Sequence, residues 1–445
     1  MKKAIYNYFS EIKNNNLKLN IVFNFFLKGF SIVINFLTIP LMLNYLDNKE
    51  YGLWILILSI TNWVYTFDIG IGNGLKNKIA QYLSFKNYIE IKKYIITSYF
   101  FVAILSLIIF GLIYILFNIL NLNTLLKVNF LNKNELLFLM VINVGFVCFN
   151  FILSLCNNIF IGSQKIYLSA LNNVFSQSLN LIFIGILYLK EEKSIFYLSI
   201  SYGVSISISH IIFTIYYFYQ NTILIPKISD ISLKKLHSVL NIGGKIFISQ
   251  IAGLIIFSTD NFIITNFLGP EMVTEYSIVY KFFSIPLIAI NLILGPIWPE
   301  ATKEYYNKNY DWFKNILKKL KKMFILLILG MLLMVCIGKK FIYIWTTYKV
   351  DPSISLIIIT ALSIILICYS GIYSTLLNGI NEISFMMILS IVQAIMNIFL
   401  SYIFIKYTAL GVNGIILATC FCMATNIFTL PKILNKKLKK LQEEQ

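Results

Sequence analysis

Four charged side chains within or at the ends of long apolar runs are the residues of this sequence that could do chemistry: Lys28, Asp68, Asp260 and Lys281. An unpaired charge at the centre of a bilayer costs roughly 2.5–3.5 kcal/mol on insertion scales. Such residues therefore pair, reach the membrane surface or line a hydrated cavity. The two lysines could hold an anion. The two aspartates could couple a proton or a sodium ion, although a helix-end role for Asp68 and a structural hydrogen bond for Asp260 compete with that function.

Polar side chains also recur at helical spacing inside several apolar runs, which places each set on one helix face. Two explanations fit such a stripe: hydroxyls and amides that join packed helices, or side chains that line a water-filled cavity. We favour packing for the Ser-only stripes and a cavity where Asn recurs or accompanies Lys. The candidate cavity residues are Lys28, Lys281, Asn24, Asn35, Asn150, Asn157, Asn291, Gln393 and Asn397.

Other kinds of site lack the residues they need. The sequence has two histidines, far apart, and six cysteines whose spacing matches no zinc or disulfide framework. The glycines of Gly70-Ile-Gly-Asn-Gly74 are not followed by the Lys-Ser/Thr of a nucleotide-binding loop. We therefore expect no catalytic residues, no metal and no cofactor, with a proton or sodium ion left open as a coupling ion.

The composition identifies the class of protein that must position these residues. Of the 445 residues, 58% are hydrophobic and only 13% are charged, which excludes a soluble globular chain. All 37 basic residues are Lys, and they lie between the apolar runs, so the net charge of +18 does not indicate a nucleic-acid partner. Any anion must be held by lysine point charges rather than by bidentate arginines.

Twelve apolar runs are long enough to span a bilayer, which needs about 20 residues each. The sequence therefore predicts an all-α polytopic membrane protein. The predicted spans are 20–43, 53–72, 94–117, 136–160, 168–189, 195–219, 246–267, 276–298, 323–337, 353–377, 384–405 and 410–430.

The lysines between these spans predict the orientation of the chain. With the N-terminus in the cytoplasm, cytoplasmic segments hold 26 lysines and external loops hold 9. Because short cytoplasmic loops are enriched in lysine, we expect both termini in the cytoplasm.

Two halves of the chain look like copies of one unit. Lys86-Asn-Tyr88 and Lys308-Asn-Tyr310 are 222 residues apart, as are Asn44 and Asn266. Six spans per half give a parallel repeat, which is transporter architecture. The expected organisation is a six-helix lobe over 1–219, a cytoplasmic linker over 220–245, a second six-helix lobe over 246–431 and a basic tail over 432–445.

Three segments near the N-terminus carry a family resemblance. Glu50-Tyr-Gly-Leu-Trp54, Ser59-Ile-Thr-Asn-Trp63 and the stretch from Asp68 to Lys78 resemble the signature of polysaccharide flippases. These are the Wzx-type O-antigen transporters of the multidrug/oligosaccharidyl-lipid/polysaccharide (MOP) exporter superfamily, which has a MATE-like fold.

The resemblance implies a V-shaped pair of six-helix lobes in the bacterial inner membrane. It implies movement of an undecaprenyl-diphosphate-linked oligosaccharide from the cytoplasmic to the periplasmic leaflet, with a polysaccharide polymerase and a chain-length regulator as further partners. In that family cationic groups of a central cavity meet the diphosphate and sugar, and Lys28 and Lys281 match them by position and type. The lack of Arg departs from relatives that use Arg there.

Two alternatives remain at this stage. A drug or metabolite antiporter of the same superfamily would use a buried carboxylate such as Asp260 for a cationic substrate, but the spans hold as many lysines as aspartates. A membrane polymerase or glycosyltransferase would usually need a large external loop with acidic residues. The longest external loop here carries one acid, Glu135, so a transporter rather than an enzyme is the prediction.

Overall fold

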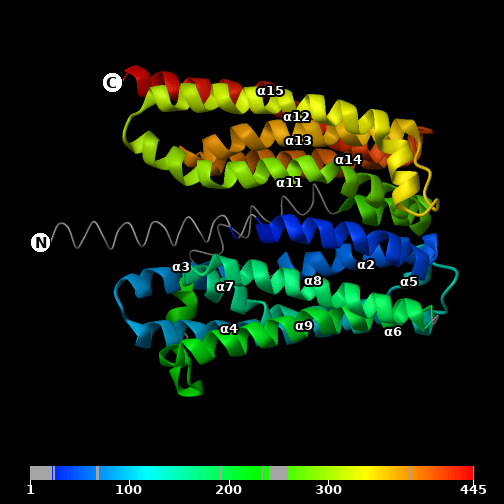
Figure 1. The fold of residues 1–445 in the computed structure, drawn as a ribbon, viewed down its shortest axis with the longest axis horizontal. Helices are drawn as coiled ribbons and strands as arrows, with labels where there is room; N and C mark the ends of the chain where they lie inside the picture. Colours follow the sequence, from blue (N-terminus) through cyan, green and yellow to red (C-terminus); the bar gives the residue numbers. More distant parts are fainter. Residues whose placement is uncertain are drawn as a thin grey trace, which may run out of the picture. The chain divides into compact units, whose positions relative to one another are not determined.

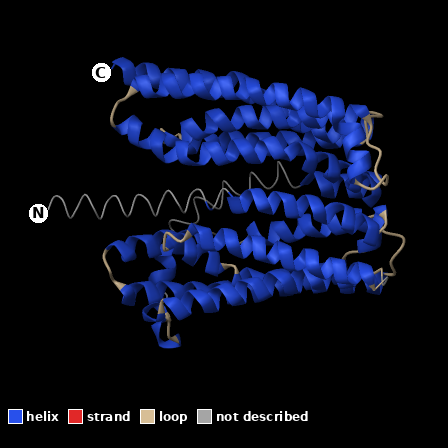
Figure 2. Ribbon diagram, in the orientation of Figure 1, coloured by secondary structure: helices blue, strands red, loops and turns tan. Residues whose placement is uncertain are grey.

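The computed structural model describes residues 23, 26–66, 70–190, 193–232, 234–239, 259–380 and 382–443. This part of the chain is built of helices joined by short loops and contains no strand (Figures 1 and 2). Of the residues predicted to form a site, Asn24 and Asp68 lie outside the described residues.

Ten described helices are long and apolar enough to cross a membrane, and they match ten of the twelve predicted spans. The other two, 53–72 and 246–267, run into residues outside the described part, although α2 (Asn48–Thr66) and residues 259–268 are helical. Large apolar side chains face outward along these helices; Leu333 of α12 (Tyr310–Trp345), for example, is 69% exposed. Such surfaces need lipid around them, so the chain is a multi-pass membrane protein.

The chain divides into two compact units. Unit 1 comprises residues 1–47 and 60–248, and unit 2 comprises residues 48–59 and 249–445. The first twelve residues of α2 therefore belong with the C-terminal half of the chain, whereas the sequence placed them in the first lobe. The segment expected as a basic tail is helical as far as Glu443 and continues the last span.

Unit 1 contains the first described helix, Phe26–Tyr45, and the helices that follow α2. α8 and α9 pack closely along each other, and α6 packs between α4 and α9. The helices are α3 (Ile71–Ser84), α4 (Tyr88–Ile119), α5 (Leu122–Leu125), α6 (Lys133–Leu153), α7 (Leu155–Gly162), α8 (Ile166–Leu189) and α9 (Ile195–Gln220), followed by the 3-10 turns η1 (Thr222–Leu224) and η2 (Ile228–Asp230).

Unit 2 is organised around α13 (Ile354–Gly379), which packs most extensively against α11 (Pro270–Tyr306) and α15 (Val412–Glu443). α14 (Ile383–Tyr407) packs on α15, and α12 packs on α11 and α13.

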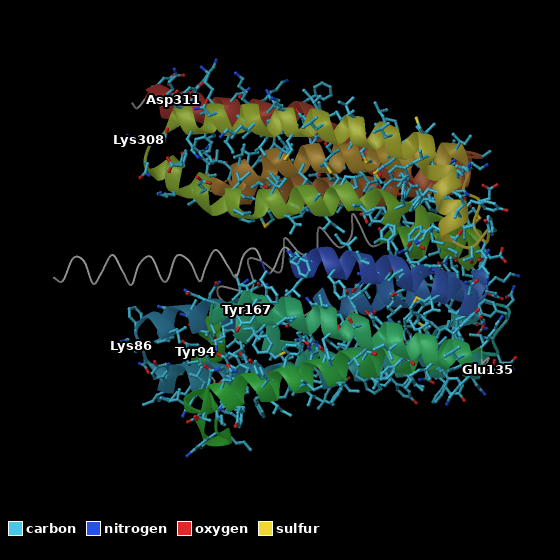
Figure 3. All side chains as sticks on the ribbon, viewed as in Figure 1. Lys86, Tyr94, Glu135, Tyr167, Lys308 and Asp311 are labelled. Carbon is cyan, nitrogen blue, oxygen red and sulfur yellow. The ribbon has the colours of Figure 1, made fainter. Side chains whose placement is uncertain are left out.

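The predicted repeat is confirmed at the turns that carried it. Both Lys86 and Lys308 adopt a left-handed backbone, with φ of 54° and 56°. Lys86 N–H donates to the Leu83 carbonyl at 3.1 Å, and Lys308 N–H donates to the Tyr305 carbonyl at 3.0 Å. Each lysine thereby closes the preceding helix in the same way, one in each unit (Figure 3).

The next residue of each copy begins the following helix. The side chain of Asn87 accepts from Glu90 N–H at 3.2 Å, and that of Asn309 accepts from Trp312 N–H at 3.1 Å. Asn is a favoured N-cap residue because its short side chain reaches an unpaired N–H of the first turn. The two Lys-Asn-Tyr segments are therefore the same helix–turn–helix device, 222 residues apart.

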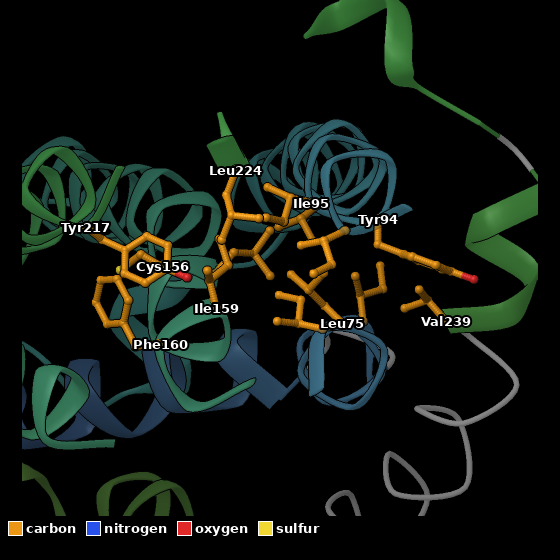
Figure 4. Close-up of a cluster of buried hydrophobic side chains, with 14 of the residues drawn as sticks. Leu75, Tyr94, Ile95, Cys156, Ile159, Phe160, Tyr217, Leu224 and Val239 are labelled. Atoms are coloured by element: carbon orange, nitrogen blue, oxygen red, sulfur yellow. The ribbon is translucent and has the colours of Figure 1, made fainter. Parts of the chain in front are cut away.

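The linker between the predicted lobes is docked on α3 and α4 of unit 1. Ser232 N–H donates to Thr97 Oγ1 at 3.0 Å, and Lys235 forms an ion pair with Glu90, which raises the pKa of Lys235. Val239 then enters a buried apolar cluster that includes Leu75 (Figure 4). This approach requires Gly74, because a methyl group there would overlap the backbone of Val239.

We therefore predict that Gly74→Ala lowers the melting temperature of the purified protein in detergent, since overpacking costs about 1–3 kcal/mol. Gly111→Ala in α4 is the matched control, because nothing lies within 4 Å of a methyl group added there. Equal melting temperatures for the two variants would show that the linker does not need its contact with α3.

Candidate functional site

A cavity of about 390 Å³ lies within unit 1 between the Phe26–Tyr45 helix and α8, a volume typical of small-molecule sites. Its polar lining comes from two helix faces: Lys28 and Ser31 on the first helix, and Ser169, Asn173 and Gln177 on α8. The remaining lining is apolar and consists of Leu27, Ile161, Ile166, Ala170 and Val174.

Lys28 is the charged residue of this cavity. Its side chain is exposed, and no described residue forms a hydrogen bond or an ion pair with it. One turn further along the helix, the Ser31 hydroxyl donates to Gln177 Oε1 at 2.7 Å and joins the two walls. Asn35 does not line the cavity, because its amide turns back to the Ser31 carbonyl at 2.9 Å.

The polar face of α8 was missed in the sequence. Ser169, Asn173 and Gln177 follow one another at intervals of four residues, which is the spacing of a single helix face. The same criterion that selected the other stripes would have found this one.

Two amides predicted to line a cavity have partners in helix packing. Asn150 Nδ2 donates to the Gly203 carbonyl at 3.0 Å, and its Oδ1 accepts from Ser207 at 2.9 Å, so Asn150 joins α6 to α9. Asn157 Oδ1 accepts from Asn172 at 3.0 Å and joins α7 to α8.

Asn172 belongs to a buried polar network that the sequence did not reveal. Its Nδ2 also lies 2.8 Å from His210 Nδ1, and its main-chain carbonyl accepts from the Ser209 hydroxyl at 2.7 Å. The network links α7, α8 and α9 through Asn172, the residue before Asn173 of the cavity wall.

In unit 2, the predicted cation Lys281 contacts a residue of the signature segment. Its Nζ donates to the Tyr51 hydroxyl at 3.3 Å and lies 5.8 Å from the centre of that ring. Gly52 lets α2 approach the first turn of α11, because a methyl group at position 52 would overlap the Pro270 backbone. Gly52 therefore lets α2 pack closely on α11, and Tyr51 of α2 contacts Lys281.

Asp260 lies in the same unit and is 4% exposed. Its Oδ2 accepts from the Tyr276 hydroxyl at 3.1 Å, whereas its Oδ1 has no hydrogen-bond partner among the described residues. The neighbouring Asn261 donates to Ser59 Oγ at 2.7 Å. Asp260 and Lys281 form no ion pair with each other in the described part of the chain. No group of three or more His, Cys, Asp or Glu side chains suited to a metal occurs there either.

The remaining predicted residues of unit 2 fall into two kinds. Gln393 and Asn397 are buried between α14 and α15, where Gln393 donates to Asn426 Oδ1 at 2.7 Å and Asn397 donates to Thr419 at 2.9 Å. Asn291 is exposed on α11. The structure thus brings Lys28 to a cavity of unit 1, and Lys281 and Asp260 to polar partners in unit 2.

The fold is that of a known class of membrane transporter. The chain is similar to the inward-facing conformation of a multidrug resistance MATE family transporter of the MOP superfamily, with a TM-score of 0.77 and 16% identity. The match covers 93% of this chain and 96% of that structure.

The sequence identifies the family within this class. Residues 17–303 match the polysaccharide biosynthesis protein family, and the chain belongs to it. It is 24% identical over 304 residues to a Yersinia pseudotuberculosis protein assigned to O-antigen export, covering 65% of this chain and 66% of that protein. It is 21% identical over 416 residues to one from Salmonella typhimurium assigned to O-antigen transport, covering 88% and 90%. The resemblance to O-antigen transporters is confirmed by the family match and by these two relatives, which are assigned to transport rather than to an enzymatic reaction.

The contacts of the amides predict different responses to substitution. Asn150→Leu removes two hydrogen bonds between α6 and α9, so we expect it to destabilise unit 1 by about 1 kcal/mol, a typical value for interhelical hydrogen bonds in membranes. Asn173→Leu has no described partner to lose and should leave the melting temperature unchanged.

Thermal unfolding of the two purified variants beside the wild type measures this difference. A melting temperature lowered by Asn173→Leu and not by Asn150→Leu would contradict the assignment of packing and cavity roles.

Proposed function

We propose that this chain is a flippase for an undecaprenyl-diphosphate-linked oligosaccharide, such as an O-antigen or capsule repeat unit. The observation that carries the proposal is the cavity of unit 1, in which one lysine without a described partner accompanies amide and hydroxyl groups. Family membership and the relatives assigned to O-antigen export support the same substrate class.

The chemistry of the substrate matches this lining. A diphosphate-linked sugar is anionic and polar, so it cannot enter hydrocarbon without groups that replace its water. Lys28 would supply a positive charge for a phosphate, and the amides and hydroxyls would bond the sugar. The lipid tail would stay in the bilayer while the head moves from the cytoplasmic to the periplasmic leaflet by alternating access.

The proposed orientation of the chain in the membrane rests on the lysines between the spans. The bias of 26 lysines against 9 supports an orientation with both termini in the cytoplasm, and the proposed substrate implies a bacterial inner membrane. In that orientation a polymerase and a chain-length regulator on the periplasmic side would be the partners that use the delivered repeat unit.

Ion coupling is assigned to Asp260 in this proposal. The carboxylate is buried, accepts one hydrogen bond from Tyr276, and keeps Oδ1 without a described partner. A proton or a sodium ion bound there would neutralise the charge, which favours burial of the site in the membrane. Asp68, the other predicted candidate, lies outside the described residues.

A cation-coupled drug or metabolite antiporter is the second candidate, and the same buried Asp260 favours it. A site for cationic drugs needs an acidic or aromatic lining. The cavity of unit 1 instead carries a lysine, which repels cations, so the anionic substrate is the better match.

The variant Lys28→Ala tests whether Lys28 of the cavity binds the phosphate of the substrate. Removing a charge-assisted hydrogen bond to phosphate weakens binding by about 1.5–3 kcal/mol, so surface polysaccharide should fall at least about tenfold while folded protein stays normal. Lys314→Ala, which removes an exposed lysine of α12, is the control and should export normally. Full surface polysaccharide in Lys28→Ala cells would remove Lys28 from the site.

The coupling role of Asp260 has its own test. Asp260→Asn keeps the shape and removes the titratable charge, so transport in proteoliposomes should no longer accelerate when a proton or sodium gradient is imposed. Asp311→Asn, at the exposed start of α12, should respond like the wild type. An Asp260→Asn variant that still responds to the gradient would exclude this carboxylate.

A further inference from the structure

The two walls of the cavity offer different chemistry to a ligand. Lys28 on the first helix has only donors and a full positive charge, so it can attract an anion but cannot distinguish one sugar from another. The α8 wall is uncharged and consists of Ser169, Asn173 and Gln177. A cavity that bound only phosphate would have no need of this second set of polar groups.

The α8 wall has hydrogen-bonding capacity that the described residues leave unused. The Asn173 side chain has no described partner, so both its carbonyl and its NH₂ group are available beside the cavity. Gln177 uses its carbonyl for the Ser31 hydroxyl, which leaves its NH₂ group as a donor. Ser31 donates to Gln177 and therefore presents only lone pairs to a ligand.

These unused donors and acceptors match the hydroxyl groups of a sugar, because each hydroxyl can both donate and accept a hydrogen bond. The adjacent carbonyl and NH₂ group of one amide can bond two neighbouring hydroxyls, and α8 repeats polar groups over two turns, or about 12 Å. At about 390 Å³ the cavity suits a mono- or disaccharide rather than a long oligosaccharide.

The helix that carries this wall is held by the buried network. Asn172, next to Asn173 in α8, is fully buried and bonded to Asn157 and His210. The orientation of the α8 face is therefore set by neighbouring helices before any ligand arrives, which preserves selectivity for the positions of hydroxyl groups.

We propose that Ser169, Asn173 and Gln177 form a sugar-specificity face, which binds the sugar next to the diphosphate while Lys28 binds the phosphate. This inference rests on the proposed function. It adds that selection among repeat units takes place on α8 of unit 1, and that charge and sugar are bound by separate helices.

The test measures binding of two lipids to the full-length protein in nanodiscs. One probe is the lipid-linked repeat unit extracted from the source bacterium, and the other is undecaprenyl diphosphate without sugar. The wild type should bind the sugar-bearing lipid at least tenfold more tightly than the bare lipid. Asn173→Leu and Gln177→Met should bind both lipids equally and keep wild-type affinity for the bare one, which also shows that they fold.

Lys28→Met should weaken the binding of both lipids by a similar factor. Asn35→Leu is the matched control, because it removes an amide that does not line the cavity, and it should keep the tenfold preference. If Asn35→Leu loses the preference for the sugar-bearing lipid, the assignment of sugar selection to α8 is also wrong.

The outcomes separate the inference from the function on which it rests. If the wild type binds both lipids equally, or if the Asn173 and Gln177 variants keep the preference, the sugar-specificity face is wrong and the flippase proposal stands. If the wild type binds neither lipid, the proposed function fails, and the inference fails with it.

Discussion

The constraint on which this structure depends is that a polar side chain within a bilayer must find its partner in the protein or in trapped water. In the described part of the chain, two groups of polar residues in the spans meet this requirement in different ways. Asn150, Asn157, Gln393 and Asn397 have partners on neighbouring helices, and each joins helices within its own unit. Lys28 and Asn173 have no described partner and line a cavity, where a ligand or water must satisfy them.

Much of the fold could be predicted from the sequence, because the length of an apolar run and the spacing of its residues are local properties. The spans and the membrane class follow from them, and the repeat follows from matching segments 222 residues apart. The role of a given amide could not be predicted, because it depends on what the neighbouring helix presents. Asn150 and Asn173 look alike in sequence, yet one faces Gly203 across a helix contact and the other faces a cavity.

The residues of the signature segments contribute to helix packing rather than to the candidate substrate cavity. Gly52 and Gly74 mark places where backbones approach too closely for a side chain, and Tyr51 orients Lys281. This explains why these segments indicate the family without indicating a sugar. The residues that we propose for the substrate lie elsewhere, on the first described helix and on α8, and α8 carries no signature.

Reconstitution of the purified protein into liposomes tests most directly whether this chain moves a lipid-linked repeat unit. The lipid-linked repeat unit from the source bacterium is placed in both leaflets, and an external glycosidase or periodate measures how much is exposed with time. A flippase should expose the inner pool, and the Lys28→Ala protein should leave about half of the lipid protected. If the inner pool stays inaccessible to the external reagent in liposomes with the wild-type protein, under every ion gradient, the proposed function is contradicted.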